Sequence, residues 1–222
     1  MKKFILMLLC LSIVLSFAGC DSSKKDLYIS ESGAEYLLVR DAHGNIVIND
    51  NDKLQVYSLN ENGKKQKDDS GEYITKFIDF NGQVVIGNVV ETAEMRFSLP
   101  KNFVADNNNP GYFSYDDVNA EIFISYYGDD PEGHIEGVAK NCEKLLESYG
   151  SEVYSYEKYN IDVDGTECTA FRMESSSSEF YNHAYSYFIP YDTGCYYINC
   201  IVKTNYAKQI DFDKFITQIE LK

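Results

Sequence analysis

Tight turns are the feature that most constrains the fold of this chain, because they recur between short apolar stretches. In the first 92 residues of the chain the turn pairs are His43-Gly44, Asn62-Gly63, Ser70-Gly71 and Asn81-Gly82. Asn-Gly between apolar runs is typical of β-hairpins, because both central turn positions need a positive φ. Segments joined by such turns pair antiparallel, so we expect hairpins and antiparallel sheets.

A weak internal repeat lies in the same region. Residues 41–48 (DAHGNIVI) match residues 79–86 (DFNGQVVI) at Asp, Gly, Val and Ile, and each copy follows an apolar stretch led by tyrosine. We interpret these copies as two similar hairpins within a β-hairpin-rich segment over residues 28–92. Two copies are too few to indicate a solenoid.

Residues 93–222 have a different order of elements, with one long helix among strands. Asp130 can cap that helix, Pro131 suits its first turn and Gly150 suits its end. An apolar stripe runs along it at helical spacing, made of Ile135, Val138, Ala139, Cys142, Leu145, Leu146 and Tyr149. The pattern predicts an amphipathic helix that packs on a sheet.

Strands precede and follow this helix. MRFSLP (95–100), GYFSY (111–115) and EIFISYY (121–127) precede it, and four strands follow at about 152–163, 166–173, 179–189 and 194–204. A short helix over Asp211–Ile219 closes the chain. The sequence therefore predicts an α+β fold, with an antiparallel β-sheet flanked by helices and preceded by the smaller hairpin-rich segment.

The first residues indicate export. Lys2 and Lys3 precede an apolar run over residues 4–17, followed by Ala18, Gly19 and Cys20. That run is shorter than the ~20 residues of a spanning helix, which favours a cleaved signal over residues 1–19. Residues 17–20 (FAGC) resemble the lipobox of bacterial lipoproteins. The resemblance implies diacylglycerol on Cys20, a tether over residues 20–27 and a place at the extracytoplasmic side of the cell membrane; the alternative is an ordinary secretory signal.

Charge and cysteine content bound the partners of the chain. The net charge of −15 repels phosphate backbones, so nucleic acid is excluded as a partner, and the membrane or another cell-envelope protein remain as candidates. The cysteines of the body are Cys142, Cys168, Cys195 and Cys200. They allow three disulfide connectivities, or they are buried free thiols. Their spacing does not match a zinc site.

Residues 93–222 also resemble the Mog1/PsbP-like family. The segments that carry the resemblance are RFSLPKNF (96–103), IFISYY (122–127), the amphipathic helix, IDVDGTECTAF (161–171) and IDFDKFITQI (210–219). The tryptophan typical of the family after the first segment is absent, and Phe103 stands near its place. The resemblance implies a compact antiparallel sheet with flanking helices and a mostly non-catalytic, accessory role, and it transfers no catalytic motif and no cofactor.

A tyrosine-rich strand carries the candidate binding face, made of Tyr181, His183, Tyr185 and Tyr187. These side chains share one side of a strand; they either pack beneath a helix or, if the long helix covers the other side, lie open for contact. We expect a non-catalytic binding or accessory module of unknown ligand. The alternatives are a hydrolase with a site around His183 and an acidic surface that holds metal ions.

Overall fold

The computed structural model describes residues 26–30, 32–106, 108–151, 153–175 and 182–222. Cys20 and Tyr181 lie outside these residues. The chain divides into two compact units, Met1–Phe80 and Asn81–Lys222, called here the first and the second unit. The boundary expected near residue 92 lies earlier, because the strands just before it pair with the second unit. Among the described residues no helix is both long and apolar enough to cross a membrane.

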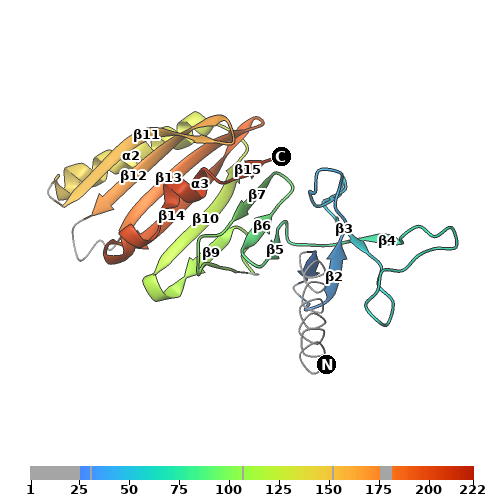
Figure 1. Cartoon of the computed structure of the whole chain (residues 1–222). Helices are drawn as coiled ribbons and strands as arrows, with labels where there is room; N and C mark the ends of the chain where they lie inside the picture. Colours follow the sequence, from blue (N-terminus) through green and yellow to red (C-terminus); the bar gives the residue numbers. More distant parts are fainter. Residues whose placement is uncertain (1–25, 31, 107, 152, 176–181) are drawn as a thin grey trace, which may run out of the picture. The chain divides into compact units, whose positions relative to one another are not determined.

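The first unit is a small antiparallel sheet (Figure 1). Its strands pair in chain order: β1 (Leu27–Ile29), β2 (Glu35–Leu38), β3 (Leu54–Tyr57) and β4 (Thr75–Ile78). The buried side chains beneath it are Tyr28, Leu38, Ile46, Leu54 and Val56. Between these strands the chain forms hairpins closed by isolated bridges, such as Arg40 with Ile46 and Leu59 with Lys65.

Four turns of the first unit have one geometry. In each, a side-chain oxygen accepts the backbone N–H groups of the residues two and four positions later, at 2.8–3.0 Å. The accepting residues are Asp41, Asn49, Asn60 and Asp68. Asp41 and Asn60 lie 19 positions apart (60 − 41), as do Asn49 and Asp68 (68 − 49). Of the two hairpins predicted from sequence, the one over residues 41–48 forms, whereas the one over residues 79–86 does not, because the strands on either side of Asn81-Gly82 pair with β3 and with β6.

The second unit is built on one large antiparallel sheet, which confirms the predicted α+β class. The strand order across it is β11 (Tyr154–Val163), β12 (Thr166–Ser175), β13 (Asn182–Tyr191), β14 (Gly194–Lys203), β10 (Ala120–Tyr127), β9 (Tyr112–Tyr115) and β8 (Val104–Ala105). The tight turn at Asp164-Gly165 joins β11 to β12 in register, as expected. A short 3-10 helix, η1 (Asp116–Val118), links β9 to β10.

The helix α2 (Pro131–Tyr149) covers one face of this sheet. Asp130 caps its first turn by accepting the amide of Gly133 at 3.0 Å, and Gly150 ends it, as the sequence predicted. On the side of the helix that faces the sheet, Cys142 packs in a cluster with the buried Phe171, Phe188 and Cys195. The part of the apolar stripe from Ile135 to Cys142 therefore faces the sheet, whereas Tyr149 at its end is exposed.

The opposite face is covered by α3 (Phe212–Ile216) and by a second sheet. The strand order of that sheet is β15 (Glu220–Leu221), β7 (Met95–Ser98), β6 (Val89–Glu91) and β5 (Val84–Ile86). The helix α3 is shorter than the expected Asp211–Ile219, because the chain turns after it to pair β15 with β7. It follows a 3-10 helix, η2 (Thr204–Gln209). Phe97 joins the layers by meeting Phe113 and Phe215 edge to face, each at 5.8 Å between ring centroids.

Candidate functional site

The tyrosine side of β13, expected as a contact face, is largely covered. Tyr187 is fully buried and Tyr185 packs on Phe212 of α3, with 5.3 Å between ring centroids. The long helix α2 does lie on the opposite face, but α3 takes the space that an open tyrosine face would need. The prediction of an open face is therefore wrong at Tyr187, which is a core residue. Nothing is described for Tyr181.

The covered tyrosines belong to a polar network centred on Asp213 of α3. Its carboxylate accepts the hydroxyl of Tyr159 at 2.5 Å, the hydroxyl of Tyr187 at 2.8 Å and Nη2 of Arg172 at 2.7 Å. Burial is the main cause that raises the pKa of both tyrosines, so both hydroxyls stay protonated donors. Because every partner is a strand residue beneath α3, the network fixes the helix on the sheet.

His183, the centre of the hydrolase alternative, lies at another cleft. Its side chain and that of Glu174 line a space with Ser151, Ser155 and Ser175. The Nδ1 atom of His183 is 3.8 Å from Oε1 of Glu174, which is beyond hydrogen-bond range. A catalytic carboxylate holds its imidazole by a direct hydrogen bond, so this pair does not have that geometry.

The four cysteines of the body are free and buried. Cys168 and Cys200 lie in the core under α3, whereas Cys142 of α2 and Cys195 of β14 lie in the cluster between α2 and the sheet. Burial raises the pKa of Cys168 to about 11, so this thiol stays protonated at neutral pH. The sequence left open whether these cysteines form disulfides or are buried free thiols, and in the structure they are free thiols.

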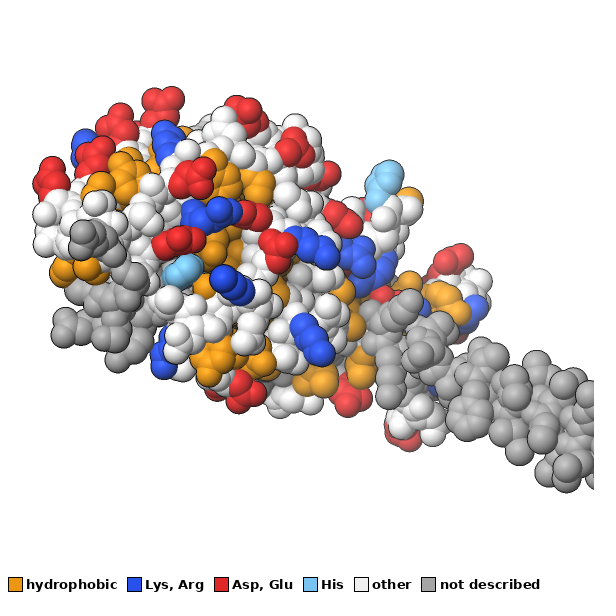
Figure 2. All heavy atoms as spheres, turned by 60° about the vertical axis from the view of Figure 1, so that its left-hand side comes forward, with side chains coloured by type: hydrophobic (Ala, Val, Ile, Leu, Met, Phe, Trp, Pro, Cys, Tyr) orange, Lys and Arg blue, Asp and Glu red, His pale blue; other side chains and the backbone are white. Residues whose placement is uncertain are grey.

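Acidic side chains are dispersed and do not gather into one cluster on the face drawn in Figure 2, where they alternate with basic and apolar ones. Within the described ranges, no three His, Cys, Asp or Glu side chains are grouped as ligands for a metal ion. The acidic-surface alternative therefore has no located site in that part of the chain.

A further cleft, called here the Gln83 cleft, lies in the second unit between the two sheets and has a volume of about 190 Å³. Its main walls are Gln83, Glu94, Phe97, Phe113, Tyr126 and Tyr196. They come from the start of β5, the turn between β6 and β7, and strands β7, β9, β10 and β14. Aromatic walls with a few polar groups are the usual composition of a small-molecule site.

Gln83 is the most informative residue of this cleft. It is only 4% exposed, and its Oε1 accepts the amide of Gly111 at 3.1 Å. Its Nε2 is buried and has no hydrogen-bond partner. Buried polar groups are nearly always paired, and leaving one unpaired costs about 1–3 kcal/mol. An amide held in this way beside a cleft is a donor without an acceptor.

Gly111 explains how that amide is held. Its φ of 81° is in the left-handed region, and a Cβ built on it would come within 2.5 Å of the carbonyl oxygen of Ile124. No other residue fits there without moving backbone. The sequence thus allows the chain to bring the Gly111 amide directly onto Gln83.

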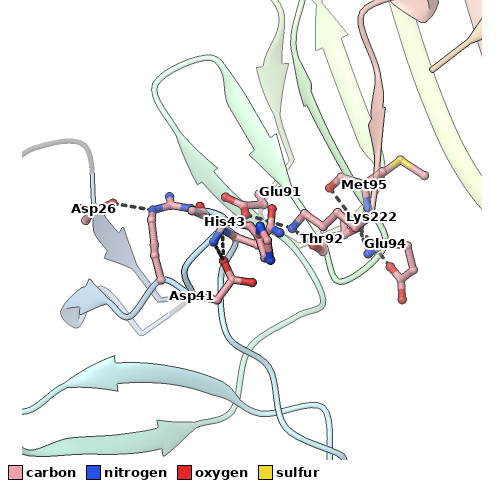
Figure 3. Close-up of polar contacts among 11 residues, drawn as sticks. Asp26, Asp41, His43, Glu91, Thr92, Glu94, Met95 and Lys222 are labelled. Carbon is pink, nitrogen blue, oxygen red and sulfur yellow. Dashed lines mark hydrogen bonds and ion pairs between the residues drawn. The ribbon is translucent and has the colours of Figure 1, made fainter. Parts of the chain in front are cut away.

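Glu94 is the second polar group of the cleft. Its carboxylate accepts the hydroxyl of Thr92 at 3.1 Å (Figure 3). Burial, followed by this carboxylate, raises the pKa of Tyr196. The nearby Lys222 is engaged elsewhere, because its ammonium contacts Glu91 at 3.0 Å and the carbonyl of Thr92 at 2.7 Å.

Sequence reasoning missed the Gln83 cleft. Gln83 was assigned to a hairpin of the first part, and neither Glu94 nor Tyr196 belongs to a motif. The side chains come from segments more than 100 residues apart, and only the pairing of β10 with β14 brings Tyr126 beside Tyr196. Local sequence pattern does not carry that information.

Comparison with solved structures gives a likeness of fold. No family model matches the chain, and no curated protein matches it. Among solved structures it is similar to the PsbP of the cyanobacterium Synechocystis sp. PCC 6803 (CyanoP), with 11% identity, a TM-score of 0.37, and coverage of 58% of this chain and 86% of that one. At this similarity the match says nothing about ligand, partner or activity.

Proposed function

We propose that the chain is a membrane-anchored extracytoplasmic lipoprotein whose second unit is a non-catalytic binding module. Its ligand occupies the Gln83 cleft. The anchor is lipid on Cys20, for which the lipobox-like FAGC and the apolar run before it are the support. Two acyl chains hold a protein stably on a bilayer, which a diacylglyceryl group provides.

The observation that carries the binding proposal is the unpartnered Nε2 of Gln83. A ligand acceptor that meets this donor removes the penalty of an unpaired buried amide. The polar side chains that line the cleft include no histidine or cysteine among the described residues; they are Asn81, Gln83, Thr92, Glu94, Ser125, Tyr126 and Tyr196. Such a set can orient a ligand, whereas a serine nucleophile needs a base within hydrogen-bond reach, and Oγ of Ser125 has no hydrogen-bond partner in the described part of the chain.

Ligand-observed NMR on the full chain in detergent tests the binding proposal. A fragment library of small amides, alcohols and amines is screened against the native protein, Gln83→Met and the control Gln218→Met, which changes an exposed glutamine outside the cleft. We expect acceptor-bearing hits that are lost in Gln83→Met and kept in the control. Hits that are indifferent to Gln83→Met, in a variant with native circular dichroism, would refute the cleft as the site.

Mass spectrometry of the protein from its own membranes tests the anchor. We expect a first residue of Cys20 with the mass of a diacylglyceryl modification, and release of Cys20→Ser into the soluble fraction. An intact leader, or an unlipidated secreted product, contradicts the anchor and leaves the cleft proposal untouched.

A further inference from the structure

The charge of the Gln83 cleft narrows the class of ligand. Glu94 is the one charged residue among the described side chains that line it. Its carboxylate accepts the hydroxyl of Thr92, and the structure records no cationic side chain paired with it in the described ranges. A partly buried carboxylate without a cation favours a positively charged ligand over an anionic one.

The aromatic walls favour the same charge. The rings of Tyr126 and Tyr196 lie 5.1 Å apart at their centroids, and Tyr126 is 43% exposed. The face of an aromatic ring attracts a cation, most strongly where water is partly excluded. Glu94 and this tyrosine pair line the same cleft, so one ammonium group can contact both.

Gln83 requires a hydrogen-bond acceptor on the ligand, in addition to the positive charge. Its Nε2 is a donor and needs an acceptor oxygen, which a bare ammonium ion lacks. The cleft volume of about 190 Å³ is below the ~300–1,000 Å³ of drug-sized sites, which limits the ligand to a small molecule.

Resting on the proposed function, we infer that the Gln83 cleft binds a small organic cation that also carries a carbonyl or hydroxyl oxygen. Its ammonium lies between the Glu94 carboxylate and the faces of Tyr126 and Tyr196. Its oxygen accepts the free N–H of Gln83. No covalent step is involved, and Glu94 and Gln83 recognise opposite ends of one ligand.

Isothermal titration calorimetry with three matched probes tests this inference on the full chain in detergent. N-acetylcadaverine carries both an ammonium and an amide oxygen, N-pentylacetamide carries only the amide, and pentylamine carries only the ammonium. We expect N-acetylcadaverine to bind at least about tenfold more tightly than either partial probe. We expect Glu94→Gln to weaken N-acetylcadaverine by about tenfold and to leave N-pentylacetamide unchanged. Glu121→Gln, which changes an exposed carboxylate of β10 outside the cleft, is the control and changes neither affinity.

Two results would overturn the inference and spare the proposed function. One is N-pentylacetamide binding as tightly as N-acetylcadaverine. The other is no binding of any probe while Gln83-dependent fragments still bind. The comparison of probes on the native chain needs no variant, so it decides the question even if Glu94→Gln fails to fold. Loss of Gln83 dependence for every fragment is the separate result that ends the proposed function itself.

Discussion

The two units of this chain are stabilised in different ways. In the first unit four turns are each closed by two bonds to one Asp or Asn side chain, while the buried core is small and Tyr73, Ile74 and Phe77 are exposed. In the second unit two sheets and two helices enclose a large apolar core. The contrast shows that local hydrogen bonds specify one unit, and long-range packing of buried side chains specifies the other.

Removing a core ring should produce the largest effect and confine it to the second unit. Phe113 is fully buried against Phe97, so Phe113→Ala should lower the free energy of unfolding by about 3–5 kcal/mol. Urea denaturation followed by circular dichroism gives the size, and hydrogen exchange with mass spectrometry identifies the unit that loosens. The matched change in the first unit is Phe77→Ala, whose side chain is 46% exposed and should change stability by less than about 0.5 kcal/mol. Equal effects would contradict the contrast.

The polar network under α3 tests whether the second unit depends on apolar packing alone. Asp213→Asn removes the carboxylate charge that faces Arg172; the Asp213 side chain is 30% exposed and that of Arg172 is 34% exposed. The change should lower the free energy of unfolding by about 1–3 kcal/mol. Hydrogen exchange of the α3 amides and the midpoint of urea denaturation measure this loss of stability. Glu157→Gln removes the other carboxylate near Arg172, at 3.8 Å and 64% exposed, and should cost less than about 0.5 kcal/mol. A larger loss in the control would reassign the anchor to Glu157.

The predictable part of the fold follows the same contrast. The Asp130 cap, the Gly150 stop and the Asp164-Gly165 turn are local, and the sequence predicted each one correctly. The second sheet was not predicted, because β15 and β7 are joined only by pairing across more than 120 residues. The packing of α3 over Tyr187 was not predicted either, because it too is a contact between segments far apart in the sequence.

The candidate site was less predictable than the fold. Gln83 follows the Asn81-Gly82 turn, for which the sequence predicted a hairpin. That prediction is wrong, because β4 before the turn pairs with β3 and β5 after it pairs with β6, and the Gln83 side chain is buried against Gly111. The unpaired Nε2 exists only because β5 and the loop before β9 meet in space. A sequence reports turns and stripes, whereas an unsatisfied donor is a property of packing.

Backbone strain at a turn should have a moderate effect in the first unit. Gly63 has a φ of 71°, so Gly63→Ala places a side chain in the left-handed region and should cost about 1 kcal/mol. Gly137 lies inside α2 with open space at its Cβ position, and Gly137→Ala should instead stabilise by about 0.5–1 kcal/mol. Thermal melting of both variants compares them directly. Destabilisation by both changes would contradict the turn explanation.

The smallest expected effect is a pH dependence confined to two of the four turns. Hydrogen bonding lowers the pKa of Asp41, chiefly through the amide of Asn45, and that of Asp68, chiefly through the hydroxyl of Ser70. A depressed carboxyl pKa adds stability above the unfolded value of about 3.9, and that stability is lost as the pH falls through the folded value. The Asn49 and Asn60 turns have no such group.

In an NMR titration from about pH 6 to about pH 2, the amides of His43 and Asn45 should therefore shift with a midpoint below that of free aspartate, and those of Asn62 and Lys64 should shift much less. Asp41→Asn should remove the titration and keep the turn, because asparagine already fills this role at Asn60. A midpoint at the ordinary aspartate value would mean that the turn bonds do not favour the charged form, and the first unit would then owe its shape to something other than its side-chain caps.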